Sequence, residues 1–335
     1  MDGWRGVSII LVLVGHFINP NWLRFGPVGV ELFFVLSGRL MAEILFVERF
    51  ALQKFYVRRV ARIFPALIVF SVGCFLLVYK TSLHYKPIGI IATDSMVYNY
   101  LTLAGHRVGV LDHIWSLCVE EHAYLLLGLI ALAARRWRWP VATILAALAG
   151  ASMADGVVSS LVFQQDWYTA YWRTDTHVAS ILAPAAIYLW SQPNGPLTVL
   201  RKFAGTSLLC ALAGLALWTP GVPNAVAYTV GTTLLAISVC TLEDAWPWMR
   251  QCLSLKALTV AGVLSYSIYL WQQPFYKLAA LAPPWATPLF FAGAILSGVA
   301  SFYIVENPAR RALNRLGERL LYRGASAADE SAAPA

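Results

Sequence analysis

Ten apolar segments limit what this chain can fold into, although several are short for a bilayer core of about 30 Å. They cover residues 7–19, 27–47, 63–79, 114–134, 140–155, 177–191, 203–219, 222–241, 258–275 and 287–305, approximately. Of the 335 residues, 59% are apolar and only 13% are charged, which excludes an ordinary soluble domain of this length. The sequence therefore predicts an all-α, polytopic membrane protein with about ten transmembrane helices.

An eleventh window, 88–104, is weaker because it carries polar residues such as Asp94 and Asn99. If it crossed the membrane, the arginines within 135–138 would move to the outer side, against the cytoplasmic preference of Lys and Arg. We therefore place this window outside as an interfacial or re-entrant segment. Most basic residues then lie inside, which predicts a multi-pass protein of the bacterial inner (plasma) membrane with both termini cytoplasmic.

The domain organisation is simple, since neither a soluble domain nor an internal repeat is visible. Residues 1–310 are expected to form the membrane domain, and 311–335 a cytoplasmic tail that is partly disordered, because its end is small and polar. The net charge of +8 belongs to the cytoplasmic loops and indicates contact with membrane lipids rather than with nucleic acid. The five cysteines are scattered without metal-ligand spacing, so no metal site is predicted.

Arg5 lies just before the first apolar segment and His16 lies within it, eleven residues later. At about 100° per residue, eleven steps return to nearly the same helix face, with the two side chains roughly 16 Å apart. Ionisable groups at membrane depth usually face a protein interior or a wet cavity. The pair is therefore a candidate functional site. Alternatively, Arg5 is only a flanking charge and His16 a hydrogen-bonded histidine at a helix end.

Three arginines, Arg58, Arg59 and Arg62, lie within about one turn at a predicted cytoplasmic helix end. The planar guanidinium fork binds phosphate oxygens in pairs, so this cluster is a candidate phosphate site. The alternative is an ordinary cytoplasmic flank that contacts anionic lipid headgroups.

A second polar cluster begins another predicted span with His113, Ser116, Glu120 and Glu121. His113 and Glu120 are seven residues apart and share a helix face, so the carboxylate could orient an imidazole or take a proton. Two adjacent glutamates that enter a span are costly, which favours a functional role. A third cluster contains Arg39, which is predicted to pair with Glu43 one turn later.

Together, these motifs resemble those of the membrane acyltransferase 3 family, in the same order and along nearly the whole chain. The matching segments are 2–6 with His16, 33–38, 58–65, 115–121, 265–271 and 306–308. The resemblance implies a ten-helix membrane enzyme that transfers an acyl group, usually acetyl, from cytoplasmic acyl-CoA to a hydroxyl of a carbohydrate or other acceptor. It identifies Arg5 and His16 with the essential Arg and His of the family, and Arg59 and Arg62 with its paired arginines.

Three positions depart from the family pattern. A histidine is usual where this chain has Gln272, a glutamine where it has His122, and an arginine where it has His177. These differences leave the acceptor open. The chain also carries no Gly-Asp-Ser esterase-type extension, which favours a stand-alone transferase.

The chemistry expected of such an enzyme is simple. An alcohol attacks a thioester slowly unless a base takes its proton, and His16 is the predicted base. Glu120 is expected to set the imidazole tautomer, and Arg5 to neutralise charge near the thioester or to join the phosphate site. Arg58, Arg59 and Arg62 would hold the phosphates of acyl-CoA, which is a donor substrate and not a permanently bound cofactor.

Three alternatives stay open. One is an acyl-histidine intermediate, since histidine can itself act as a nucleophile. Another is a transporter or flippase that moves a polar or glycan-linked substrate along the same charged residues. The third is a catalytically silent membrane scaffold or sensor.

Overall fold

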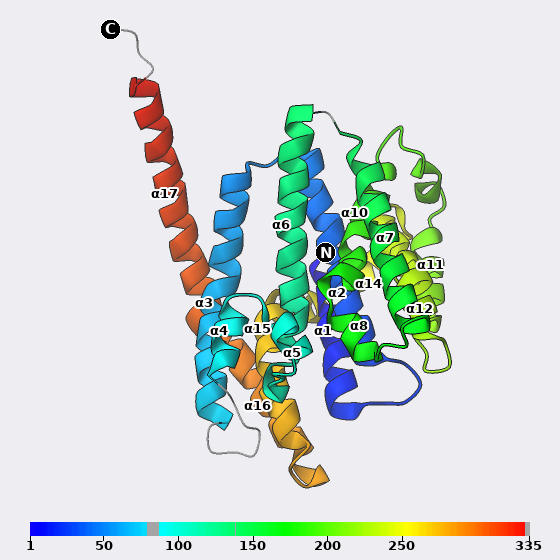
Figure 1. Cartoon of the computed structure of the whole chain (residues 1–335), viewed down its shortest axis with the longest axis vertical. Coiled ribbons are helices and arrows are strands. Elements are labelled where there is room, and N and C mark those ends of the chain that lie inside the picture. Colours follow the sequence, from blue (N-terminus) through cyan, green and yellow to red (C-terminus); the bar gives the residue numbers. More distant parts are fainter. Residues whose placement is uncertain (79–86, 138, 332–335) are drawn as a thin grey trace.

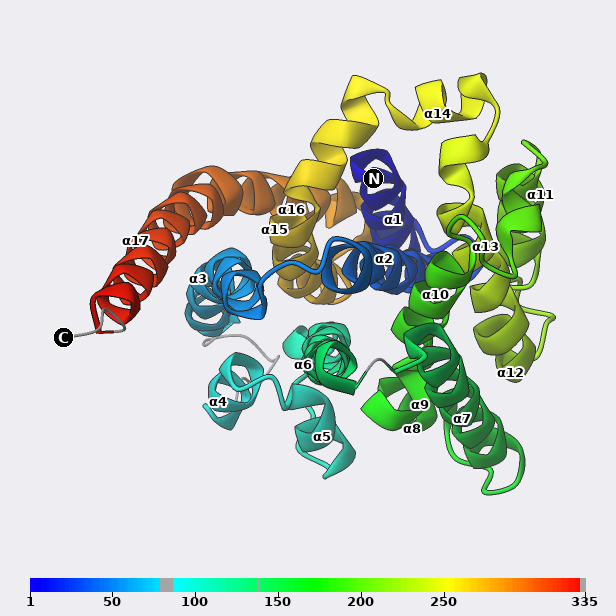
Figure 2. The ribbon, with the colours of Figure 1, turned by 90° about the horizontal axis from the view of Figure 1, so that it is seen from above.

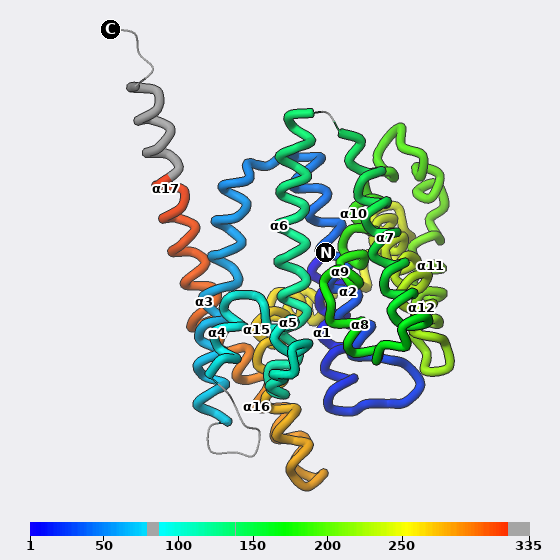
Figure 3. The backbone as a smooth tube through the Cα atoms, in the orientation of Figure 1, coloured from blue at the N-terminus to red at the C-terminus, as the bar shows by residue number. Residues whose placement is uncertain are grey.

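The structure is a computed structural model that describes residues 1–78, 87–137 and 139–331, with side chains up to residue 320. Within these residues every regular element is a helix, which confirms the all-α prediction. Figure 1 and the backbone trace in Figure 3 show a bundle of long, roughly aligned helices, with α17 leaving it at one side.

The first half of the chain contains long helices, two of which end in a π-helical turn, and three short elements between α3 and α6. These elements are α1 (Asp2–Leu13) with η1 (Val14–Ile18), α2 (Phe25–Ala42) with η2 (Glu43–Val47), α3 (Leu52–Val78), α4 (Ile88–Asp94), α5 (Tyr98–Leu103), η3 (Gly109–Leu111), α6 (Ile114–Trp137) and α7 (Val141–Leu161).

The second half is more interrupted. Its elements are α8 (Trp167–Trp172), α9 (Thr174–His177), α10 (Ala179–Trp190), η4 (Thr198–Arg201), α11 (Thr206–Ala216), α12 (Asn224–Val226), η5 (Ala227–Gly231), α13 (Thr232–Cys240), η6 (Leu242–Asp244), α14 (Pro247–Leu253), α15 (Lys256–Ala279), η7 (Pro284–Ala286), α16 (Thr287–Ser301), η8 (Phe302–Glu306) and α17 (Asn307–Ser331).

Four of these helices are long and apolar enough to cross a membrane: Leu52–Val78, Ile114–Trp137, Val141–Leu161 and Pro284–Leu320. A fifth is added if α14 and α15, which meet at a bend of 52°, form one span. The remaining apolar windows lie on shorter or interrupted helices, such as Thr206–Ala216 and Asn224–Cys240. The chain is thus a multi-pass helical membrane protein, and four to five spans follow from length and composition.

The weak window 88–104 forms two short helices, α4 and α5, instead of one span. The break lies at Met96, which has a positive φ of 56°. Helices of seven and six residues are far too short for a bilayer, which needs about 20 residues. This segment therefore packs beside α3 and α6 rather than crossing as a helix (Figure 2).

The N-terminal helix α1 lies near the centre of the bundle, between α2 and α15 (Figure 2). Glycines allow this close approach: a Cβ at Gly6 would lie 2.1 Å from the Leu258 carbonyl oxygen, and one at Gly262 would lie 1.9 Å from the Asp2 carbonyl oxygen. Such backbone contacts are typical of membrane helix interfaces. They fix the depth and rotation of α1, and hence the position of Arg5.

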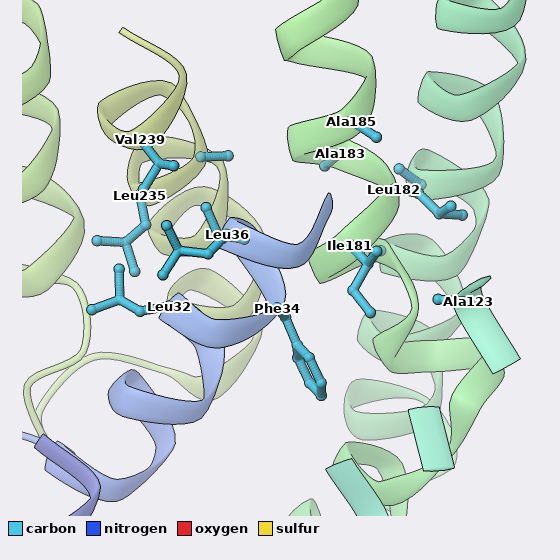
Figure 4. Close-up of a cluster of buried hydrophobic side chains, with 14 of the residues drawn as sticks. Leu32, Phe34, Leu36, Ala123, Ile181, Leu182, Ala183, Ala185, Leu235 and Val239 are labelled. Atoms are coloured by element: carbon cyan, nitrogen blue, oxygen red, sulfur yellow. The ribbon is translucent and has the colours of Figure 1, made fainter. Parts of the chain in front are cut away.

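Opposite faces of α2 pack against different helices (Figure 4). Leu32 and Leu36, which are fully or almost fully buried, face Leu235 and Val239 of α13. Phe34 points to the other side of α2. Packing on both sides holds α2 rigidly, so that its polar residues can line a defined site.

The expected domain boundary at 310/311 lies inside α17, which begins at Asn307 and runs to Ser331. Pro308 lies inside a continuous helix that runs over Pro284–Leu320, directly after the π-helical turn η8. Part of the expected tail is therefore helical, and it packs on α3: a Cβ at Gly317 would lie 2.3 Å from Val57 Cγ1. Residues 332–335 lie outside the described residues.

Candidate functional site

A cavity of about 290 Å³ opens between α1, α2, α3, α6 and α15. Its charged lining residues are Arg5, Glu48, Arg58, Arg59, Arg62 and Glu120, and its hydroxyl-bearing lining residues are Ser37, Ser116, Tyr124, Ser265, Tyr266 and Tyr269. Glu48 and Arg58 are close in sequence to the start of α3, and Ser116 is close to the start of α6. These two helix starts lie at opposite ends of the bundle (Figure 1). The cavity thus brings together five of the six predicted site residues, all except His16.

Arg59 is held within the protein by carboxylates. Its Nε and Nη2 donate hydrogen bonds to Glu121 Oε1 at 3.0 and 2.7 Å, and Nη2 lies 3.5 Å from Glu120 Oε1. Its guanidinium also lies 3.3 Å from the ring centre of Tyr124. Two carboxylates therefore compensate the charge of Arg59, which explains the adjacent glutamates in α6.

Glu120 is oriented by hydroxyl groups rather than by a histidine. Ser37 donates a hydrogen bond to Glu120 Oε1 at 2.6 Å, and Tyr124 donates one to the same oxygen. The carboxylate is thus held at the cavity wall by α2 and α6. The expectation that Glu120 orients an imidazole is wrong here, since neither His16 nor His113 forms a hydrogen bond with it.

Arg62 differs from Arg59 because it makes no ion pair or hydrogen bond with the described residues. It interacts electrostatically with Arg5, and at longer range with Glu120 and Glu121. Arg5 has a weak ion pair with Asp2, at 3.5 Å, and Arg58 has one with Glu318 of α17, at 3.6 Å. An anion in the cavity would relieve the repulsion between Arg5 and Arg62, because like charges at close range cost free energy.

The end of the cavity away from Arg58 carries two hydroxyl groups in contact. Ser116 Oγ lies 2.7 Å from Tyr269 Oη, and each lies 3.0 Å from the carbonyl oxygen of His113. Two hydroxyl protons serve these three contacts, so one contact at a time lacks a proton. These hydroxyl oxygens can therefore accept a further hydrogen bond, and either hydroxyl can donate to a ligand when it gives up one of these contacts.

His16 lies outside this cavity, in the π-helical turn η1. Its Nδ1 is 2.6 Å from Gln272 Oε1, and its ring stacks on Tyr276 with centres 4.6 Å apart and planes 10° apart. His16 therefore does not line the cavity that Arg5 lines, although both residues belong to the N-terminal helical segment. The α2 residue next to His16 is Gly26, whereas the α2 residues that line the cavity begin at Val30.

The imidazole of His113 is buried, and neither of its nitrogens bonds to a side chain in the described part of the chain. Its ring packs edge-on against Phe70 and Tyr269, with centres 5.5 and 5.3 Å apart. The predicted pairing with Glu120 is wrong, because the Glu120 carboxylate is bound by Ser37 of α2 and lies beside Arg59 of α3.

A buried carboxylate outside the predicted site, Glu31, explains the unusual His177. His177 Nε2 lies 3.0 Å from Glu31 Oε2, and Thr232 donates to Glu31 Oε1 at 2.6 Å. The only sign of this pair in the sequence is the carboxylate of Glu31 inside the apolar segment 27–47. His122, another departure from the family, lies 2.8 Å from Thr174 Oγ1.

The predicted pair between Arg39 and Glu43 is confirmed at 3.0 Å, and Arg39 also binds Glu243. No group of three or more His, Cys, Asp or Glu side chains within the described part of the chain could hold a metal ion.

Comparison with known proteins identifies similar sequences. The acyltransferase domain family matches residues 1–307. The peptidoglycan O-acetyltransferase OatA of Listeria monocytogenes is 27% identical over 93% of this chain and 55% of its own length. The O-acetyltransferase OatA of Staphylococcus aureus is 25% identical, over 93% of this chain and 57% of its own. The putative peptidoglycan O-acetyltransferase YrhL of Bacillus subtilis is 24% identical, over 92% and 54%.

This chain thus spans just over half the length of the curated relatives that it matches. No solved structure matches it.

Proposed function

Since the chain belongs to the acyltransferase domain family, we propose that it transfers an acetyl group from cytoplasmic acetyl-CoA to a hydroxyl of a glycan. The observation that carries this proposal is the arginine-lined cavity, which holds Arg5, Arg58, Arg59 and Arg62 but only two carboxylates, Glu48 and Glu120. The relatives named peptidoglycan O-acetyltransferases support peptidoglycan, or a precursor of it, as the acceptor.

The donor enters the cavity from the end where α3 begins. There Arg58 and Arg62 bind phosphate oxygens of CoA, since guanidinium forks suit phosphate. Arg5 lies near the thioester, and Arg59 holds Glu120 and Glu121 in place. The acetyl end then reaches the hydroxyl groups of Ser116 and Tyr269, which can stabilise the oxyanion that forms on the thioester carbonyl.

The acceptor approaches from the opposite side, where His16 lies. His16 Nε2 takes the proton of the acceptor hydroxyl as its oxygen attacks the thioester carbon. The C–S bond then breaks, the CoA thiolate leaves, and the proton returns from His16 to the sulfur. The products are an acetyl ester and CoA-SH, and no acyl-enzyme is needed.

This arrangement requires a membrane topology. We propose ten spans, in which the shorter and interrupted helices cross together with the four to five long ones. Both termini then lie in the cytoplasm and the protein resides in the bacterial inner membrane. The acetyl group passes from a cytoplasmic donor site toward an acceptor on the outer side. Membership of an acyltransferase family argues against a transporter or a scaffold.

The test uses purified full-length chain in detergent with acetyl-CoA and soluble peptidoglycan fragments. CoA release is followed with a thiol reagent, and mass spectrometry detects an added acetyl group on the glycan. We expect both signals to appear together and to vanish when His16 is replaced. Acetyl-CoA consumption that is absent with every glycan acceptor, in a protein that still binds acetyl-CoA, would refute the proposal.

A further inference from the structure

We infer that Gln272 is a positioning residue that holds His16 in one neutral tautomer, with the proton on Nδ1 and the lone pair on Nε2. The role of that lone pair in catalysis rests on the proposed function, whereas the tautomer itself does not.

Three amide groups form a chain that leads to His16. Gln273 Nε2 lies 3.5 Å from the carbonyl oxygen of Gly109, and Gln272 Nε2 lies 3.4 Å from Gln273 Oε1. A backbone carbonyl can only accept, so it selects the NH₂ group of Gln273 as its partner. The carbonyl oxygen of Gln273 must then face Gln272 and accept from the NH₂ group there.

His16 contacts the carbonyl oxygen of the Gln272 side-chain amide. With its NH₂ group turned to Gln273, Gln272 presents Oε1 to His16 Nδ1 at 2.6 Å. This oxygen can only accept a hydrogen bond, so Nδ1 must carry the proton. In a neutral imidazole, Nε2 is then unprotonated and basic. The backbone of Gly109 therefore sets, through two side chains, which nitrogen of His16 can take a proton.

The surroundings make this orientation rigid. Gln272 and Gln273 are 0% and 3% exposed, so water does not compete for their hydrogen bonds. Tyr276, one turn after Gln272 on α15, stacks on the face of the imidazole. The edge and the face of the His16 ring are thus both held by α15.

The Nε2 atom lies on the side of the ring away from Gln272. His16 Nε2 has no hydrogen-bond partner among the described residues, and the residue is only partly buried. A Cβ at position 26 would lie 3.8 Å from Nε2, so Gly26 keeps that side free of a side chain. Lys277 and His113 are the ionisable groups that interact electrostatically with the ring. A neutral amide partner orients the imidazole without adding a negative charge, unlike the aspartate of a serine protease.

The direct test is nitrogen NMR of the protein labelled with ¹⁵N-histidine. The chain has six histidines, and His16→Gln assigns the His16 signals by their loss. At a pH where His16 is neutral, we expect a protonated Nδ1 and an unprotonated Nε2. In Gln272→Met, which keeps the side-chain length but removes both polar groups, we expect the two tautomers to mix. A protonated Nε2 in the unmodified protein would overturn the inference.

Kinetics provide the second test. Gln272→Met should lower kcat for acetyl transfer to peptidoglycan fragments by about 100-fold, within the usual range for loss of general-base catalysis. The KM for acetyl-CoA should not change, because Gln272 does not line the donor cavity. Gln273→Met should lower kcat less, since Gln272 stays but can rotate. Gln251→Met, at an exposed position of α14, is the matched control and should match the unmodified protein.

The two tests separate the failure of the inference from that of the proposed function. An active His16→Ala variant would refute the catalytic base, whatever the tautomer. An inactive His16→Ala variant together with a fully active Gln272→Met variant would refute the positioning role alone.

Discussion

Arg62 of α3 and Arg5 of α1 face the same cavity, and no carboxylate among the described residues forms an ion pair with Arg62. Arg59, one turn earlier on α3, is bound to Glu121 and Glu120. Neighbouring arginines of one motif therefore have different partners: Arg59 is paired with carboxylates, and Arg62 has no ion pair among the described residues.

Replacing Arg62 by Ala should weaken binding of acetyl-CoA about 10- to 100-fold, the loss expected for one hydrogen-bonded charge pair. Isothermal titration calorimetry or the KM for acetyl-CoA measures this loss. A short acetyl thioester without the nucleotide should be almost insensitive to the change. Arg136→Ala, at an exposed position of α6, serves as control. Equal losses for both donors would contradict a phosphate-binding role.

Replacing Arg59 by Ala should destabilise the protein by about 3 kcal/mol, because removal of one partner leaves a largely buried charge uncompensated. Thermal unfolding in detergent measures the effect. The double variant Arg59→Ala/Glu121→Gln should recover part of the stability, since the second change removes the unpaired carboxylate. An Arg59→Ala protein that unfolds like the unmodified one would show that the pair is not structural.

Replacing His16 by Gln should lower acetyl transfer by about 10² to 10⁴-fold, since a general base is lost. Binding of acetyl-CoA should stay unchanged because His16 lies outside the donor cavity. Parallel turnover and calorimetric measurements check both statements. Loss of acetyl-CoA binding would instead place His16 at the donor.

The topology can be tested by cysteine labelling. Exposed Cys252 is first replaced by Ser, and a cysteine is introduced at His106, an exposed residue after α5, or at Arg136. A membrane-impermeant thiol reagent added to intact cells should label position 106, and it should label position 136 only after the membrane is opened. Position 106 is preferable to Arg107, whose Nη2 lies 2.7 Å from Asp112 Oδ2. Labelling of position 136 from outside would invert the orientation.

Local features of the site could be predicted from the sequence. The pair between Arg39 and Glu43 depends on one helical turn, and the order of the motifs along the chain indicated the family. The polarity of 88–104 likewise argued against a span. Each of these properties is carried by neighbouring residues, whose relative geometry follows from the regular helix alone.

Contacts between distant segments could not be predicted in this way. His16 and Gln272 are 256 residues apart, and nothing in either segment indicates that a glutamine, rather than Glu120, reaches the imidazole. Whether Arg59 or Arg62 is bound by a carboxylate depends on how α6 packs against α3, which side-chain packing across the whole bundle decides. The sequence by itself determined the helical membrane class, the family and the residues with chemistry. Only the tertiary structure decided which of those residues meet, because such contacts arise from the packing of helices that are remote along the chain.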